Sequence, residues 1–193
     1  MAATVEIVRV TGAYPGAYET IASNTVANAQ DVHQETAGTS SNPIKIPSAG
    51  RSCSYWVNTA LRMITDDGNT INNIKWYSDG DMGFGTAVAC KVATIGSGCM
   101  GGYTQATGTI GSSGVQLSDT AYNHNGIGSF HLAPETPIDA AAYTSAGAQL
   151  IVSGTLTTPG WMSGFVVYQL EVGPSATAGT TAQETFTWQY DEF

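Results

Sequence analysis

Apolar and polar residues alternate along residues 55–64, with the two-residue period that is typical of a half-buried β-strand. Two more β-compatible runs follow, INNIKWYS at residues 71–78 and TAVACKVA at residues 86–93. The acidic segments DDGN (residues 66–69) and SDGD (residues 78–81) separate these runs, and Asp, Gly and Asn tolerate the positive φ of tight turns. The pattern therefore predicts that the three strands form an antiparallel meander.

Further runs along the chain have the length and alternation of strands. They are residues 3–11, 128–134, 148–156, 164–172 and 184–193. We also expect a short edge strand over residues 42–47, bounded by Pro43 and Pro47. A short helix is expected over residues 137–144, with Thr136 as its N-cap and a proline at its first position.

Eight to ten strands with no long amphipathic helix predict an all-β protein, an antiparallel β-sandwich. A jelly-roll-like arrangement is preferred because the strands exceed seven and their connections are long, and an immunoglobulin-like sandwich is the alternative. Alternating faces predict sheets with only one dry face. In the last strand Phe186, Trp188 and Tyr190 share a face. The chain is interpreted as a single domain, with a strand and extended arm over residues 1–50 and the sandwich over residues 51–193.

The segment from residue 12 to residue 50 is unusually long for a connection and is poor in large apolar residues. Its prolines favour an extended backbone that can lie along a neighbouring subunit. We therefore expect Ile44 and Ile46 to lie in an interface. Trp161, in the turn sequence TTPGWMSG, is expected to be exposed and to anchor a protein contact.

Charged residues make up only 11% of the 193 residues, against about 25% in an average globular protein. A surface of small neutral residues suits a protein that packs against neighbours, because each buried charge costs desolvation. The formal net charge of −9, with six Lys and Arg, argues against binding to nucleic acid or to an anionic membrane surface. No apolar run is long enough for a transmembrane helix, and MAATVEIVRV lacks the pattern of a signal peptide. Synthesis in the cytoplasm is expected.

No sequence motif predicts catalysis, a cofactor or a metal. Gly96, Gly98 and Gly101 match the dinucleotide pattern, but further glycines follow where the required helix should begin. The acidic turns do not have the spacing of a calcium loop, so turn geometry explains them. The histidines are far apart and form no HExxH motif, and no GxSxG motif is present. We therefore expect a protein that is not an enzyme.

The three cysteines leave two arrangements open. Cys90 and Cys99 flank a short loop and are able to pair if the protein matures outside a reducing compartment, leaving Cys53 as a buried thiol. In a cytosolic protein all three are expected to be reduced and buried.

Two stretches resemble β-sandwich structural proteins of tailed viruses, such as head decoration and other accessory virion proteins. They are NNIKWYSDG at residues 72–80 and FVVYQLEVGPSATAGTTAQETFTWQYDEF at residues 165–193. The resemblance implies a non-enzymatic subunit of a virion. Such a subunit forms a homo-oligomer, expected here as a trimer, and docks on the major capsid protein or another virion protein.

The four tryptophans and nine tyrosines also allow a different function. Exposed aromatic rings stack on sugar faces, so a carbohydrate-binding module or an adhesin-type surface domain is the alternative, with a glycan as ligand. Trp76 and Trp188, which lie on predicted strand faces, are instead expected in the core.

Overall fold

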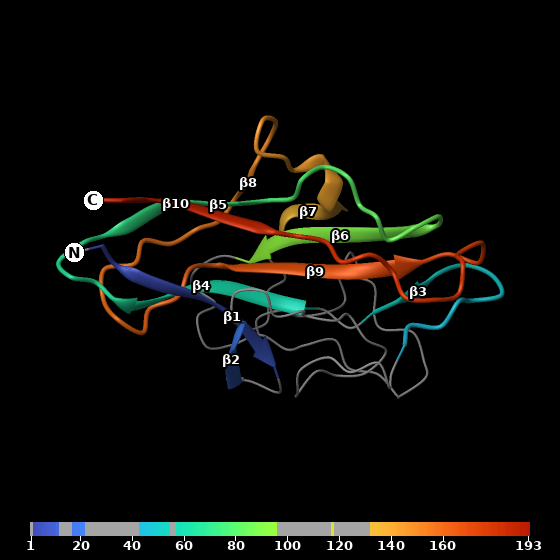
Figure 1. Cartoon of the computed structure of the whole chain (residues 1–193), viewed down its shortest axis with the longest axis horizontal. Helices are drawn as coiled ribbons and strands as arrows, with labels where there is room; N and C mark the ends of the chain where they lie inside the picture. Colours follow the sequence, from blue (N-terminus) through green and yellow to red (C-terminus); the bar gives the residue numbers. More distant parts are fainter. Residues whose placement is uncertain (1, 12–16, 22–42, 55–56, 96–116, 118–131) are drawn as a thin grey trace.

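The computed structural model describes residues 2–11, 17–21, 43–54, 57–95, 117 and 132–193 (Figure 1). These residues form two antiparallel sheets. The larger sheet has seven strands in the order β2-β1-β4-β9-β6-β7, with β3 paired to β9, and the smaller has the order β10-β5-β8. The bounds of the larger sheet are β1 Thr4–Thr11, β2 Ala17–Ile21, β3 Ser52–Cys53, β4 Val57–Thr65, β6 Val88–Ile95, β7 Leu132–Asp139 and β9 Phe165–Val172. Those of the smaller sheet are β5 Ile71–Tyr77, β8 Leu150–Ile151 and β10 Thr187–Glu192.

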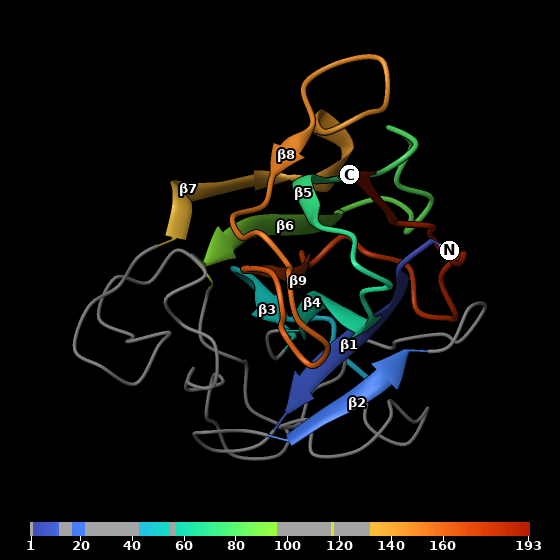
Figure 2. The same cartoon turned by 90° about the vertical axis from the view of Figure 1, so that its left-hand side faces the viewer.

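The two sheets pack face to face, so the predicted antiparallel β-sandwich is confirmed. Figure 1 shows β5 and β10 over β4 and β9, and Figure 2 shows β5 and β8 over β6 and β9. The choice between jelly-roll-like and immunoglobulin-like connections stays a prediction, because several connections run through residues outside the described part of the chain.

The predicted meander is wrong, although its three strands exist. β4 pairs with β1 and β9, β5 pairs with β10 and β8, and β6 pairs with β9 and β7. The turn after β4 is closed by a 2.6 Å bond from the Asn69 N–H to the Asp66 carbonyl, with Asp67 at φ 45° and Gly68 at φ 84°. This turn leads from one sheet to the other. The alternation of apolar and polar residues shows which side of a strand is buried. Which neighbouring strands it pairs with depends on how the sheets pack.

The core between the sheets is built around Trp76 on β5, which is 1% exposed. Its ring centroid lies 6.5 Å from that of Tyr143 and 4.8 Å from that of Phe186, and Phe186 lies 5.4 Å from Tyr168 on β9. Trp188 and Tyr190 also pack on this core, as the shared face of the last strand predicted. Burial of Trp76 is therefore confirmed.

The opposite face of the larger sheet is also buried, which corrects the expectation of one dry face per sheet. Val8, Ala60 and Val167 alternate with the core-facing residues of their strands and are fully inaccessible. Leu117 is buried as well, and its N–H bonds to the side chain of Gln169 on this face. A sheet with two dry faces has continuous burial, and only one of the eight residues of β9 is not buried.

Three local predictions are corrected. Residues 43–47 form no strand, because their prolines lack N–H donors and pairing begins only at β3. Residues 137–144, where a helix was predicted, instead form the end of β7 and then the 3₁₀ helix η2 (Ala140–Ala142). The N-cap of η2 is Asp139 rather than Thr136. Pro137 is tolerated in β7 because that strand is at the edge of the sheet. The run at residues 148–156 is a strand only at Leu150–Ile151, and Gly154 at φ 117° interrupts it.

Candidate functional site

The three residues predicted to lie in an interface, Ile44, Ile46 and Trp161, are all at least partly exposed to solvent. Ile46 is 39% exposed and Ile44 is half-buried, in the irregular segment that leads into β3. Trp161 is 47% exposed, as predicted from its turn. Its N–H bonds to the Thr158 carbonyl at 3.1 Å, and its carbonyl accepts from the Met63 N–H at 3.0 Å, which fixes the turn against β4.

These residues do not form one surface. Trp161 precedes the first residue of β9, whereas β3, which follows Ile46, pairs with the last residue of β9, Val172. Eight residues of strand span roughly 25 Å at about 3.3 Å per residue. Figure 1 accordingly shows β3 and the loop before β9 at opposite ends of the sandwich. We call these the β3 end and the Trp161 end.

Two further apolar side chains are exposed at the Trp161 end. Ile64 follows Met63, the residue bonded to Trp161, and Phe193 is 73% exposed. Phe193 exchanges hydrogen bonds of 2.8 and 3.0 Å with Thr70, so it extends the pairing of β10 with β5. Both residues lie in the predicted strands 55–64 and 184–193, and the alternation of these strands gives no sign that the two residues are at a sheet end.

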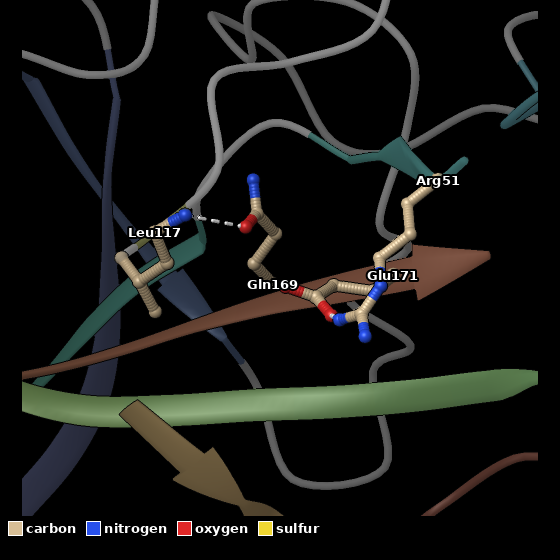
Figure 3. Close-up of polar contacts among 4 residues, drawn as sticks. All are labelled: Arg51, Leu117, Gln169 and Glu171. Carbon is tan, nitrogen blue, oxygen red and sulfur yellow. Dashed lines mark hydrogen bonds and ion pairs between the residues drawn. The ribbon is translucent and has the colours of Figure 1, made fainter. Parts of the chain in front are cut away.

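A cavity of about 330 Å³ lies at the β3 end. Arg51, Lys91 and Glu171 contribute its charged side chains, and Val88 and Pro174 its apolar walls. Glu171 is only 4% exposed, and its carboxylate is bound by Nη1 of Arg51, whose side chain is 59% exposed (Figure 3). A half-exposed arginine thus neutralises a buried carboxylate.

Gln169 lies two residues before Glu171 on the same face of β9. Its Oε1 accepts from the Leu117 N–H at 2.7 Å (Figure 3). Its Nε2 donates to the Ser54 carbonyl at 2.7 Å. The side chain is fully buried, and both ends of its amide are bonded. Gln169 therefore ties the buried outer face of the sheet to the segment that holds Arg51.

The described cysteines are free, buried thiols. Burial, followed by the nearby Glu171 carboxylate, raises the pKa of Cys53 to about 11, and Arg51 acts in the opposite direction. Burial, followed by Asp139 and Glu184, also raises the pKa of Cys90. Cys99 lies outside the described residues.

Cys53 and Cys90 are therefore expected to resist a thiol reagent at pH 8, because the reactive thiolate is suppressed in both. Mass spectrometry of folded protein treated with iodoacetamide checks which residues are modified. Because the pKa of Cys53 is higher in the folded protein than in the unfolded chain, the protonated thiol favours folding at pH values below the unfolded pKa of 9.0. This contribution to stability is lost as the pH rises toward the folded pKa of about 11. Rapid labelling of either residue in folded protein would contradict this burial.

The described residues offer no metal centre: no group of three His, Cys, Asp or Glu side chains among them is placed to hold an ion. The Asp66 and Asp79 carboxylates instead accept bonds from the N–H groups of Gly68 and Asp81 in their own turns. His33, His124 and His131 lie outside the described residues, as do Gly96, Gly98, Gly101 and Trp56. In the described part of the chain, no helix has the length and apolarity to span a membrane.

No protein-family model, no curated protein and no solved structure matches this chain.

Proposed function

We propose that this protein is a non-enzymatic structural subunit of a larger protein assembly, and specifically an accessory or decoration subunit of a virus particle. The observation that carries the proposal is that large apolar side chains are exposed at both ends of the sandwich. Ile46 is exposed at the β3 end, and Ile64, Trp161 and Phe193 are exposed at the Trp161 end.

Exposed apolar side chains at separated places favour a subunit that contacts more than one neighbour. Ile138 on β7 and Ile151 on β8 are exposed as well, away from these two ends. Tryptophan is among the residues that contribute most to binding energy in protein interfaces. The low charge of the chain adds to this argument, because charged residues are depleted at the centres of interfaces.

The virion context, the major capsid protein or another virion protein as partner, and a trimeric homo-oligomer are proposed from the resemblance at residues 72–80 and 165–193. A subunit of this kind needs no catalytic group, cofactor or metal. Its stability and its contacts depend on the sandwich and on the exposed apolar residues.

Exposure of Trp161 also supports the alternative of a glycan-binding or adhesin domain. A sugar-binding groove needs several exposed aromatic rings side by side. Among the side chains that the structure describes, Trp161 and Phe193 are the exposed aromatic ones, and Tyr77, Tyr143, Tyr168 and Tyr190 are buried or half-buried. This distribution favours protein contacts.

Replacing both Ile44 and Ile46 with aspartate is expected to weaken association at least about tenfold, because two charges enter an apolar contact. Sedimentation velocity over a concentration series measures the association constant. Ile151→Asp is the control, since Ile151 is exposed on the smaller sheet away from both ends. A thermal melt separates lost association from unfolding, which matters because Ile44 is half-buried. An unchanged association constant in a folded double variant would refute a contact through this segment.

A further inference from the structure

We propose that the cavity at the β3 end is a carboxylate-binding site that takes an acidic side chain from a loop of a partner protein. The source of this ligand rests on the assembly proposed above, whereas the site itself is argued from its own side chains.

The cavity concentrates positive charge in an acidic protein. The chain has six Lys and Arg against 15 Asp and Glu, and Arg51 and Lys91 line this one cavity. Across the part of the chain that the structure describes, the side chain of Lys91 makes no hydrogen bond or ion pair. Arg51 uses Nη1 for Glu171, which leaves its other N–H donors for a ligand. Two cations with unused side-chain donors therefore line the same cavity.

Glu171 positions Arg51 for this role. Its buried carboxylate holds the Arg51 guanidinium at the cavity wall. Binding of a ligand therefore does not have to offset the conformational entropy lost by ordering the Arg51 side chain. Asp139 is the residue of β7 opposite Lys91, and its Oδ1 accepts from the Ala141 N–H at 3.1 Å. One oxygen of that carboxylate caps η2, and its negative charge stays next to Lys91 on the neighbouring strand.

The charge count selects the ligand class. The lining side chains Arg51, Lys91 and Glu171 have one net positive charge, and Asp139 beside Lys91 adds a negative charge outside the lining, so the site favours a ligand with no more than one negative charge. A doubly charged phosphate would add a second negative charge beside Glu171, and like charges repel at this range. The volume of about 330 Å³ is near the lower end for ligand pockets, and the walls from Val88 and Pro174 suit a short aliphatic stem.

Titrating ¹⁵N-labelled protein with the peptide acetyl-Gly-Asp-Gly-amide tests the site without any partner protein. We expect amide shifts at Gly50, Arg51, Val88, Lys91 and Gly173, with a dissociation constant on the order of 1 mM. The matched peptide acetyl-Gly-Asn-Gly-amide has the same shape without the charge, and it should give no shifts there. Equal shifts from both peptides, or shifts confined to other residues, would overturn the proposal.

Lys91→Gln should weaken binding of the aspartyl peptide about tenfold, since it removes one charge-assisted contact. Lys75→Gln is the control, because Lys75 is on β5 in the other sheet and should bind like the wild type. Lys91→Gln leaves the Arg51–Glu171 pair intact, so it avoids the instability expected of an Arg51 variant. Unchanged affinity in Lys91→Gln, or tighter binding of inorganic phosphate than of the peptide, would refute the site. If the protein binds the aspartyl peptide in this cavity but does not associate, the proposed assembly is refuted and the carboxylate site stands.

Discussion

Replacing Trp76 with alanine is expected to cost about 3–5 kcal/mol of unfolding free energy. The indole is 1% exposed and packs against Tyr143 and Phe186, so its removal leaves a cavity between the two sheets. Chemical denaturation of the variant and the wild type, monitored by circular dichroism, measures the difference.

Trp161→Ala is the matched control, because it removes the same side chain from a site that is 47% exposed. This variant should lose about 1 kcal/mol or less. If Trp76→Ala also lost less than about 1 kcal/mol, the indole would not be in the core, and the packing of β5 against β9 would be wrong.

Replacing Gln169 with leucine is expected to cost about 2–4 kcal/mol, because it removes two hydrogen bonds to buried backbone groups. The two groups are the Leu117 N–H and the Ser54 carbonyl, each 2.7 Å from the Gln169 amide in the wild type. Leucine has a similar volume, so the loss measures the hydrogen bonds rather than a cavity. The same denaturation experiment gives the value.

Gln189→Leu is the control for this substitution, since Gln189 is exposed on β10. It should change stability by less than about 0.5 kcal/mol. A similarly small effect of Gln169→Leu would mean that the outer face of the larger sheet is open to water at β9.

Alternation predicted most strands of the fold, because each strand has a face directed at the core. β9 and β10 were predicted within a few residues, and so was the common face of Phe186, Trp188 and Tyr190. The pairing of β4, β5 and β6 was not predictable, because a two-residue period specifies which side of a strand is apolar and not which strand lies beside it.

The candidate site residues also divide into those with a local sequence signal and those without one. Exposure of Trp161 followed from its Pro-Gly turn, which is a local signal. The pair of Arg51 and Glu171 joins residues 120 positions apart, and no motif marks it. One signal was present: Gln169 and Glu171 are polar residues on one face of a strand whose other positions are apolar. Polar residues in a strand buried on both faces indicate specific partners.

The native mass of the intact protein tests the proposed structural role most directly. Native mass spectrometry or light scattering from about 1 μM to about 1 mM covers the range of affinities expected for subunits that assemble. The proposal predicts a species whose mass is a multiple of the 20.0 kDa protomer and whose share rises with concentration. A single 20.0 kDa species at every concentration would contradict the homo-oligomer on which the account depends.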